Sequence, residues 1–95
     1  MSRYYLSSAA EEDVLAAWDY IARDSVTAAD RMIDRFSSAF ERIARHPEAG
    51  ARFEHSKGEF RFVIAGAYLV FYKLAGDEAA IVRVLHSARR WEDLL

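Results

Sequence analysis

The stretch EFRFVIAGAYLVFYKLAGDEAAIVRVLHSARR, residues 59–90, predicts three consecutive strands that form a meander. In residues 60–65 every second side chain is large and apolar, which is the pattern of a strand with one buried face. Residues 68–74 are apolar or aromatic at nearly every position and predict a central strand covered on both faces. A third strand is expected over residues 80–86, and short glycine-containing turns separate the three strands.

Two amphipathic helices are predicted upstream of these strands, near residues 8–24 and 27–46. In each, apolar side chains recur every three or four residues and form one stripe along the helix. Ser8 and Glu11 have the spacing of a capping box for the first helix, and Thr27 can cap the second. Because the link between the helices is short, they are expected to pack as an antiparallel hairpin.

A short strand is predicted over residues 3–6, whereas residues 48–58 are polar, show no periodicity and are expected to form a loop. Because the helices intervene, the first strand should return to the edge of the sheet, with both helices across one face. The predicted fold class is α+β in the order β-α-α-β-β-β, a helical hairpin on a small, mainly antiparallel sheet, in a single domain over residues 1–95. The predicted core contains nine side chains: Val14, Trp18, Ile21, Ile33, Phe36, Phe40, Ile43, Phe71 and Val84.

The composition of the whole chain restricts its possible functions. With no cysteine and three scattered histidines in 95 residues, we expect no disulfide, no metal site and no cofactor. The net charge of −2 argues against a protein that binds nucleic-acid phosphates directly. The first residues lack the apolar run of a signal peptide, and no apolar stretch approaches the ~20 residues of a membrane span. We therefore expect a cytoplasmic protein with no membrane partner.

One candidate site consists of basic groups on adjacent predicted strands: Arg61, Lys73, Arg83 and His86. If these groups converged on one face, they could hold a phosphate and transfer protons. Arg83 and His86 are three positions apart, however, and point to opposite faces of a regular strand. We therefore favour a solvated or salt-bridged sheet face, and assign no catalytic residue.

The tail after the last strand is a second candidate, because Arg89, Arg90 and Trp91 stand together near the chain end. Tryptophan and arginine dominate the residues that contribute most to binding at protein interfaces. The alternative is that Trp91 folds back and covers the sheet. The sequence favours neither alternative over the other.

An ordered set of short runs extends over almost the whole chain. In the helices it comprises Ala10, Asp13, Trp18-Asp19-Tyr20-Ile21, Ala28-Ala29, Arg31, Ile33-Asp34-Arg35, Phe40-Glu41-Arg42-Ile43-Ala44, Pro47 and Gly50. In the strands it comprises Arg61, Gly66, Tyr68, Phe71-Tyr72, Val82-Arg83-Val84-Leu85-His86 and Ala88-Arg89. Together these runs resemble the ParE toxins of bacterial toxin–antitoxin systems, within the RelE/ParE superfamily.

The resemblance implies a cytoplasmic toxin with a helical hairpin on a small antiparallel sheet. It also implies a ParD-like antitoxin, encoded beside the toxin, that binds and neutralises it. Such antitoxins resemble ribbon-helix-helix DNA-binding proteins, so contact with DNA is expected only through the antitoxin. ParE-like toxins are associated with poisoning of DNA gyrase, whereas RelE-like toxins cleave messenger RNA on the ribosome.

The residues favour the gyrase-directed class. RelE-type nucleases tend to carry an arginine directly after the tyrosine that follows the turn glycine, where this chain has Leu69. They often end with a catalytic tyrosine or a His-Tyr pair, whereas this chain ends Trp91-Glu92-Asp93-Leu94-Leu95. We therefore expect a gyrase inhibitor that is not an enzyme. The alternatives are a RelE-like ribosome-dependent endoribonuclease and an inactive, partner-binding remnant of the family.

Poisoning of gyrase requires a binding surface rather than covalent chemistry. The tail is the best candidate for that surface, with the end of the last strand as its floor. The predicted target-binding residues are Arg83, His86, Arg89, Arg90 and Trp91.

Overall fold

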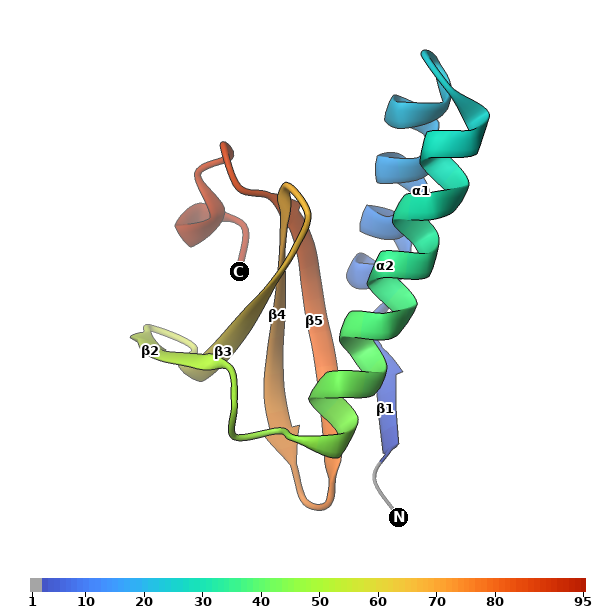
Figure 1. Ribbon diagram of the computed structural model, residues 1–95. Coiled ribbons are helices and arrows are strands. Elements are labelled where there is room, and N and C mark those ends of the chain that lie inside the picture. The colour runs from blue at the N-terminus through green and yellow to red at the C-terminus, as the bar shows by residue number, and fades with distance from the viewer. Residues whose placement is uncertain (1–2) are drawn as a thin grey trace.

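The structure, a computed structural model, describes residues 3–95 as a helical hairpin packed against one face of a five-stranded sheet (Figure 1). The elements follow in the order β1 (Arg3–Leu6), α1 (Ser8–Ala22), α2 (Val26–Arg45), β2 (Ala51–His55), β3 (Gly58–Ala65), β4 (Tyr68–Ala75), β5 (Glu78–His86) and a 3-10 helix (Trp91–Asp93). Neither helix in this part of the chain has the length and apolar character needed to cross a lipid bilayer.

The strands lie in the order β1-β5-β4-β3-β2, so β4 is central, as its continuous apolar run predicted. The pairs β2–β3, β3–β4 and β4–β5 are antiparallel, whereas β1 pairs with β5 in parallel at one edge. The α+β class, the return of the first strand to an edge and the single helix-covered face are therefore confirmed.

The predicted loop over residues 48–58 is wrong in part, because β2 lies within it and forms a hairpin with β3. This strand is an edge strand, and only Phe53 and His55 turn partly inward. Its remaining side chains are exposed, so the apolar alternation that identifies a half-buried strand is too short to detect. Gly58, with a φ of 119°, takes a backbone conformation at the hairpin turn that other residues rarely adopt.

Both predicted helix caps are wrong by one or two residues. Ser7 caps α1, because its Oγ accepts a hydrogen bond from the Ala10 amide at 3.0 Å. The same hydroxyl donates to the Val82 carbonyl of β5 at 2.9 Å, so contact with the sheet determines where the helix begins. Ser25 caps α2 in the same manner, through the Ala28 amide at 3.1 Å.

Most of the core lies between α2 and the sheet, whereas Phe71 is buried on the other face of the sheet, beside Trp91. Of the nine predicted core residues, five are buried: Phe36, Phe40, Ile43, Phe71 and Val84. The other four are only partly buried: Val14, Trp18, Ile21 and Ile33. Three of them lie on α1, which buries only two alanines, whereas α2 supplies most of the helical contribution to the core. Trp18 donates its indole N–H to Asp30 Oδ1 at 2.9 Å and so joins the two helices outside the core.

Candidate binding site between α1 and the end of β5

The last residues of β5 extend beyond the short edge strand β1, whose pairing ends at Leu6 and Ile81. Side chains at the start of α1 satisfy the exposed backbone groups of this edge. Ser7 Oγ donates to the Val82 carbonyl, and Asp13 Oδ2 accepts from the Val84 amide at 2.9 Å. Helix α1 is thereby fixed directly beside the end of β5.

Asp13 also forms an ion pair with Arg83 of β5. Nε and Nη2 of Arg83 donate to Oδ2 and Oδ1 of Asp13 at 2.7 and 2.9 Å. The pKa of Arg83 is raised, first by its hydrogen bond with Asp13, although burial opposes the shift. The third donor, Nη1, reaches the Leu94 carbonyl at 2.6 Å. Arg83 thus links α1, β5 and the tail, and each of its three side-chain nitrogens donates a hydrogen bond within the fold.

A pocket of about 330 Å³ opens between α1 and the end of β5. Ala16 and Ala17 of α1 line this pocket, and their short side chains do not fill it. Its lining combines acidic, basic and phenolic groups with small apolar ones: Asp13, Ala16, Ala17, Tyr20, Tyr68, Val84, His86 and Arg89. Tyr20 is 65% exposed, so its ring is accessible at the mouth of the pocket.

Two contacts fix the orientation of the His86 ring. Its ring packs edge-to-face against Tyr68, with the ring centroids 5.3 Å apart. Its Nδ1 accepts a hydrogen bond from the Ala88 amide at 3.1 Å, so the ring proton is on Nε2. Burial raises the pKa of Tyr68, with a smaller contribution from Tyr20. The lining therefore offers N–H and O–H donors rather than a free base.

The tail lies across the sheet face opposite the helices (Figure 1). The Trp91 ring packs against Phe53 and Phe71, at centroid distances of 5.1 and 5.2 Å. Two basic side chains of the β2–β3 hairpin donate to tail carbonyls: His55 Nε2 to Glu92 at 3.0 Å, and Lys57 Nζ to Leu95 at 2.6 Å. Of the two alternatives for Trp91, the structure shows the one in which it covers the sheet.

The basic groups of the strands do not converge on one site. Arg61 donates to the carbonyls of Glu48 and Gly50, at 2.9 and 3.2 Å, and holds the turn after α2. Lys73 donates to the Lys57 carbonyl at 3.1 Å and lies over the Phe60 ring. In residues 3–95 no group of three metal-ligating side chains is close enough to hold an ion.

The structure therefore divides the five predicted target-binding residues. His86 and Arg89 line the pocket together, whereas Arg83 is committed to Asp13 and Trp91 to the opposite face of the sheet. Arg90 is exposed, 3.9 Å from Asp93. The sequence interpretation missed the contribution of α1 to the pocket. The spacing of Asp13, Ala16, Ala17 and Tyr20, which places them on one helix face, was the available signal.

The fold and its pocket define a class of small α+β proteins in which a helical hairpin covers a sheet. A family model described as the ParE toxin of the type II toxin–antitoxin system parDE matches residues 4–91. Toxin ParE1 of Mycobacterium tuberculosis is 32% identical over 87 residues, covering 90% of this chain and 89% of that protein. The chain therefore belongs to the ParE toxin family.

Two further similarities bear on the fold and on the range of activities. Toxin RelE2 of Caulobacter vibrioides is 35% identical over 77 residues, covering 81% of this chain and 85% of that protein. A solved structure described as a chromosomal ParDE toxin–antitoxin system from P. aeruginosa superposes with a TM-score of 0.71. The superposition covers 90% of this chain and 96% of the chain in that structure, at 15% sequence identity. This likeness shows the shared fold.

Proposed function

We propose that this protein is a toxin that stops bacterial growth by binding DNA gyrase in the cytoplasm, and that a ParD-like antitoxin neutralises it. The main observation in support of this proposal is the pocket between α1 and β5, which presents Tyr20, His86 and Arg89 together. Aromatic rings and a guanidinium are the groups that most often supply the binding energy at protein interfaces. Gyrase is proposed as the target because the chain belongs to the ParE family and ParE-like toxins are associated with gyrase poisoning.

The hydrogen bonding of His86 supports a role in binding. A general base in messenger cleavage must accept a proton through an exposed ring nitrogen. The exposed nitrogen of His86 carries the proton, because the other nitrogen accepts from the backbone. Leu69, in place of the arginine typical of RelE-type nucleases, agrees with this interpretation. We therefore treat the protein as an inhibitor and not an enzyme.

A ribosome-dependent endoribonuclease is the second candidate, because two of the similar proteins are named RelE toxins. Induced expression in bacterial cells separates the possibilities. We expect growth to stop, and to recover when the neighbouring reading frame is co-expressed as the antitoxin. Primer extension on abundant messengers should show no codon-specific cuts. Such cuts would favour the nuclease, and unaffected growth would indicate an inactive remnant.

A further inference from the structure

Basic side chains recur at helical spacing along the exposed side of α2. Arg31, Arg35, Arg42 and Arg45 follow one another at intervals of four, seven and three residues, with Ser38 in the gap. This spacing places all five on one face of the helix, and each is exposed. The four arginines, named here the arginine stripe, stand out because the whole chain has a net charge of −2.

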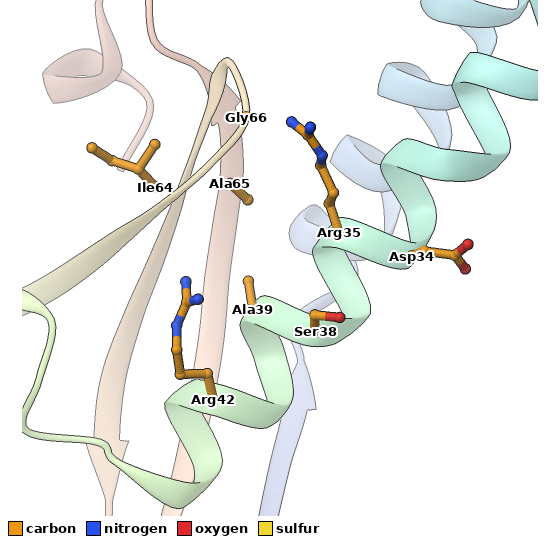
Figure 2. Close-up of a pocket in the computed structure, with 8 residues that line it drawn as sticks. All are labelled: Asp34, Arg35, Ser38, Ala39, Arg42, Ile64, Ala65 and Gly66. Atoms are coloured by element: carbon orange, nitrogen blue, oxygen red, sulfur yellow. The ribbon is translucent and has the colours of Figure 1, made fainter.

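The middle of the arginine stripe borders a groove of about 340 Å³ between α2 and β3. Figure 2 shows Arg35 and Arg42 extending from α2 into the space beside the strand; Asp34 also borders the groove, with its carboxylate turned away from the strand. Arg35 Nη1 lies against the β3–β4 turn, so close that a Cβ added at Gly66 would be 2.8 Å from it. Gly66 thus leaves room for the guanidinium at the end of the groove.

Within residues 3–95 none of the four arginines forms an ion pair. Arg31 and Arg35 are one helical turn apart, a placement in which like charges destabilise a helix. Arg42 and Arg45 stand in the last turn, where the helix dipole favours cations. No such effect accounts for Arg35. Unpaired like charges beside a groove make it suitable for a negatively charged ligand.

The surroundings favour an acidic polypeptide over a nucleic acid. No aromatic ring lines the groove, so it lacks a surface on which bases could stack. Ile64 lines it instead and is 65% exposed, which suits an apolar side chain of a peptide.

We infer that this groove binds an acidic segment of the antitoxin, whose carboxylates pair with Arg35 and Arg42 while an apolar side chain covers Ile64. The inference rests on the proposed function, which supplies the partner. Seven residues of helix separate the two arginines by roughly 10 Å along the axis. The matching carboxylates are thus about seven residues apart in a helical segment of the partner.

The test measures binding of the purified product of the neighbouring reading frame to the toxin by titration calorimetry. Arg35→Glu/Arg42→Glu should weaken binding on the order of 100-fold, because two attractive charge pairs become repulsive. Arg35→Lys/Arg42→Lys keeps the charge and should retain most of the affinity. Arg3→Glu/Arg23→Glu makes the same change in net charge at exposed positions elsewhere, and should stay within about threefold of wild type.

Each outcome has a distinct meaning. Selective loss in the Arg35/Arg42 charge reversal, with an unchanged melting temperature, supports the groove as the antitoxin site. Equal binding by both charge-reversed variants overturns the inference while leaving the proposed function intact. Failure of the wild type to bind removes the antitoxin assignment and this inference with it. Tight binding of a 20-nucleotide RNA or DNA that the Arg35/Arg42 reversal abolishes, with antitoxin binding unaffected, would also overturn it.

Discussion

The carboxylate of Asp13 on α1 holds the guanidinium of Arg83 on β5 through two hydrogen bonds, and also accepts the amide of the next residue of the strand. Seventy positions separate the two residues in the sequence. Their side chains are 11% and 21% exposed, so the ion pair is partly shielded from water. One short acidic side chain therefore fixes the first helix against the edge of the sheet and, through Arg83, against the tail.

Replacing Asp13 by alanine should lower the free energy of unfolding by about 2–3 kcal/mol. The substitution leaves the partly buried guanidinium of Arg83 without its counter-ion and the Val84 amide without an acceptor. Chemical denaturation followed by circular dichroism measures the effect. Glu12→Ala, an exposed neighbour on the same helix, should change the stability by less than about 0.5 kcal/mol. Equal stability of the two variants would show that the ion pair contributes little.

Truncating Phe36 to alanine should cost about 3–5 kcal/mol, enough to unfold much of a domain this small. The ring is 1% exposed and packs edge-to-face on Tyr68, so its removal leaves a cavity between α2 and the sheet. Phe40→Ala should behave alike. Thermal melts compare both with Leu15→Ala, whose side chain is 66% exposed. If the phenylalanine variants melt as the wild type does, the helical stripe does not form the core.

The stability of the protein should fall at alkaline pH, in part through Tyr72. Burial raises its pKa above 10.0, although a hydrogen bond with Gly50 and the charge of Arg61 act in the opposite direction. Below pH 10 the phenol is protonated in the folded and unfolded chains, so its contribution is fully present. As the pH rises further, the unfolded chain loses the proton first, and stability falls through the folded-state pKa.

Tyr72→Phe tests this expectation. At neutral pH the variant should lose about 1–2 kcal/mol, because the hydroxyl donates to the Pro47 carbonyl at 2.6 Å and accepts from the Gly50 amide at 3.1 Å. Urea denaturation at pH 8.5 and 10.5 should then show a smaller alkaline loss in the variant than in the wild type. Identical losses would exclude Tyr72 as a source. An alkaline loss of stability that remains in the Tyr72→Phe variant would point to Tyr68, whose pKa is also raised by burial.

Trp91→Ala should destabilise the protein by about 1–3 kcal/mol, because its ring covers two phenylalanines of the sheet. Arg90→Ala, at the adjacent exposed position, should leave the stability unchanged within about 0.5 kcal/mol. Denaturation curves of the two variants provide the comparison. A Trp91→Ala protein as stable as wild type would mean that the tail is not held against the sheet in solution.

The sequence predicted the fold well where the apolar pattern was long. The continuous apolar run of residues 68–74 identified the central strand, and the stripe with Phe36 and Phe40 identified the buried face of α2. The pattern could not reveal β2, because an edge strand with Phe53 as its one large apolar side chain has no alternation to detect. The cap of α1 was displaced because Ser7 is selected by its contact with β5, a long-range effect absent from local spacing.

The site was less predictable because it depends on which faces the topology brings together. His86 and Arg89 were identified as candidates from the sequence, but their pocket is completed by Tyr20 and Ala16 of a helix about 70 residues earlier. Arg83 was taken as part of the binding surface because nothing in its neighbourhood reveals that Asp13 pairs with it. Trp91, next to two exposed arginines, could be assigned to an interface or to the sheet until the tail was placed.

Supercoiling of relaxed plasmid DNA by purified gyrase, with and without this protein, tests the proposed mechanism most directly. The pocket assignment adds a pair of matched variants. His86→Ala/Arg89→Ala removes two groups of the pocket, whereas Arg90→Ala/Lys57→Ala removes two basic side chains outside it. Circular dichroism and thermal melts first establish that both variants fold as the wild type does.

We predict that the wild type and the Arg90/Lys57 variant inhibit supercoiling at comparable concentrations, whereas the His86/Arg89 variant needs at least about tenfold more protein. Full inhibition by the His86/Arg89 variant would place the gyrase-binding surface elsewhere on the molecule. A wild-type protein that leaves supercoiling unaffected at every concentration would contradict the assignment of gyrase as the target.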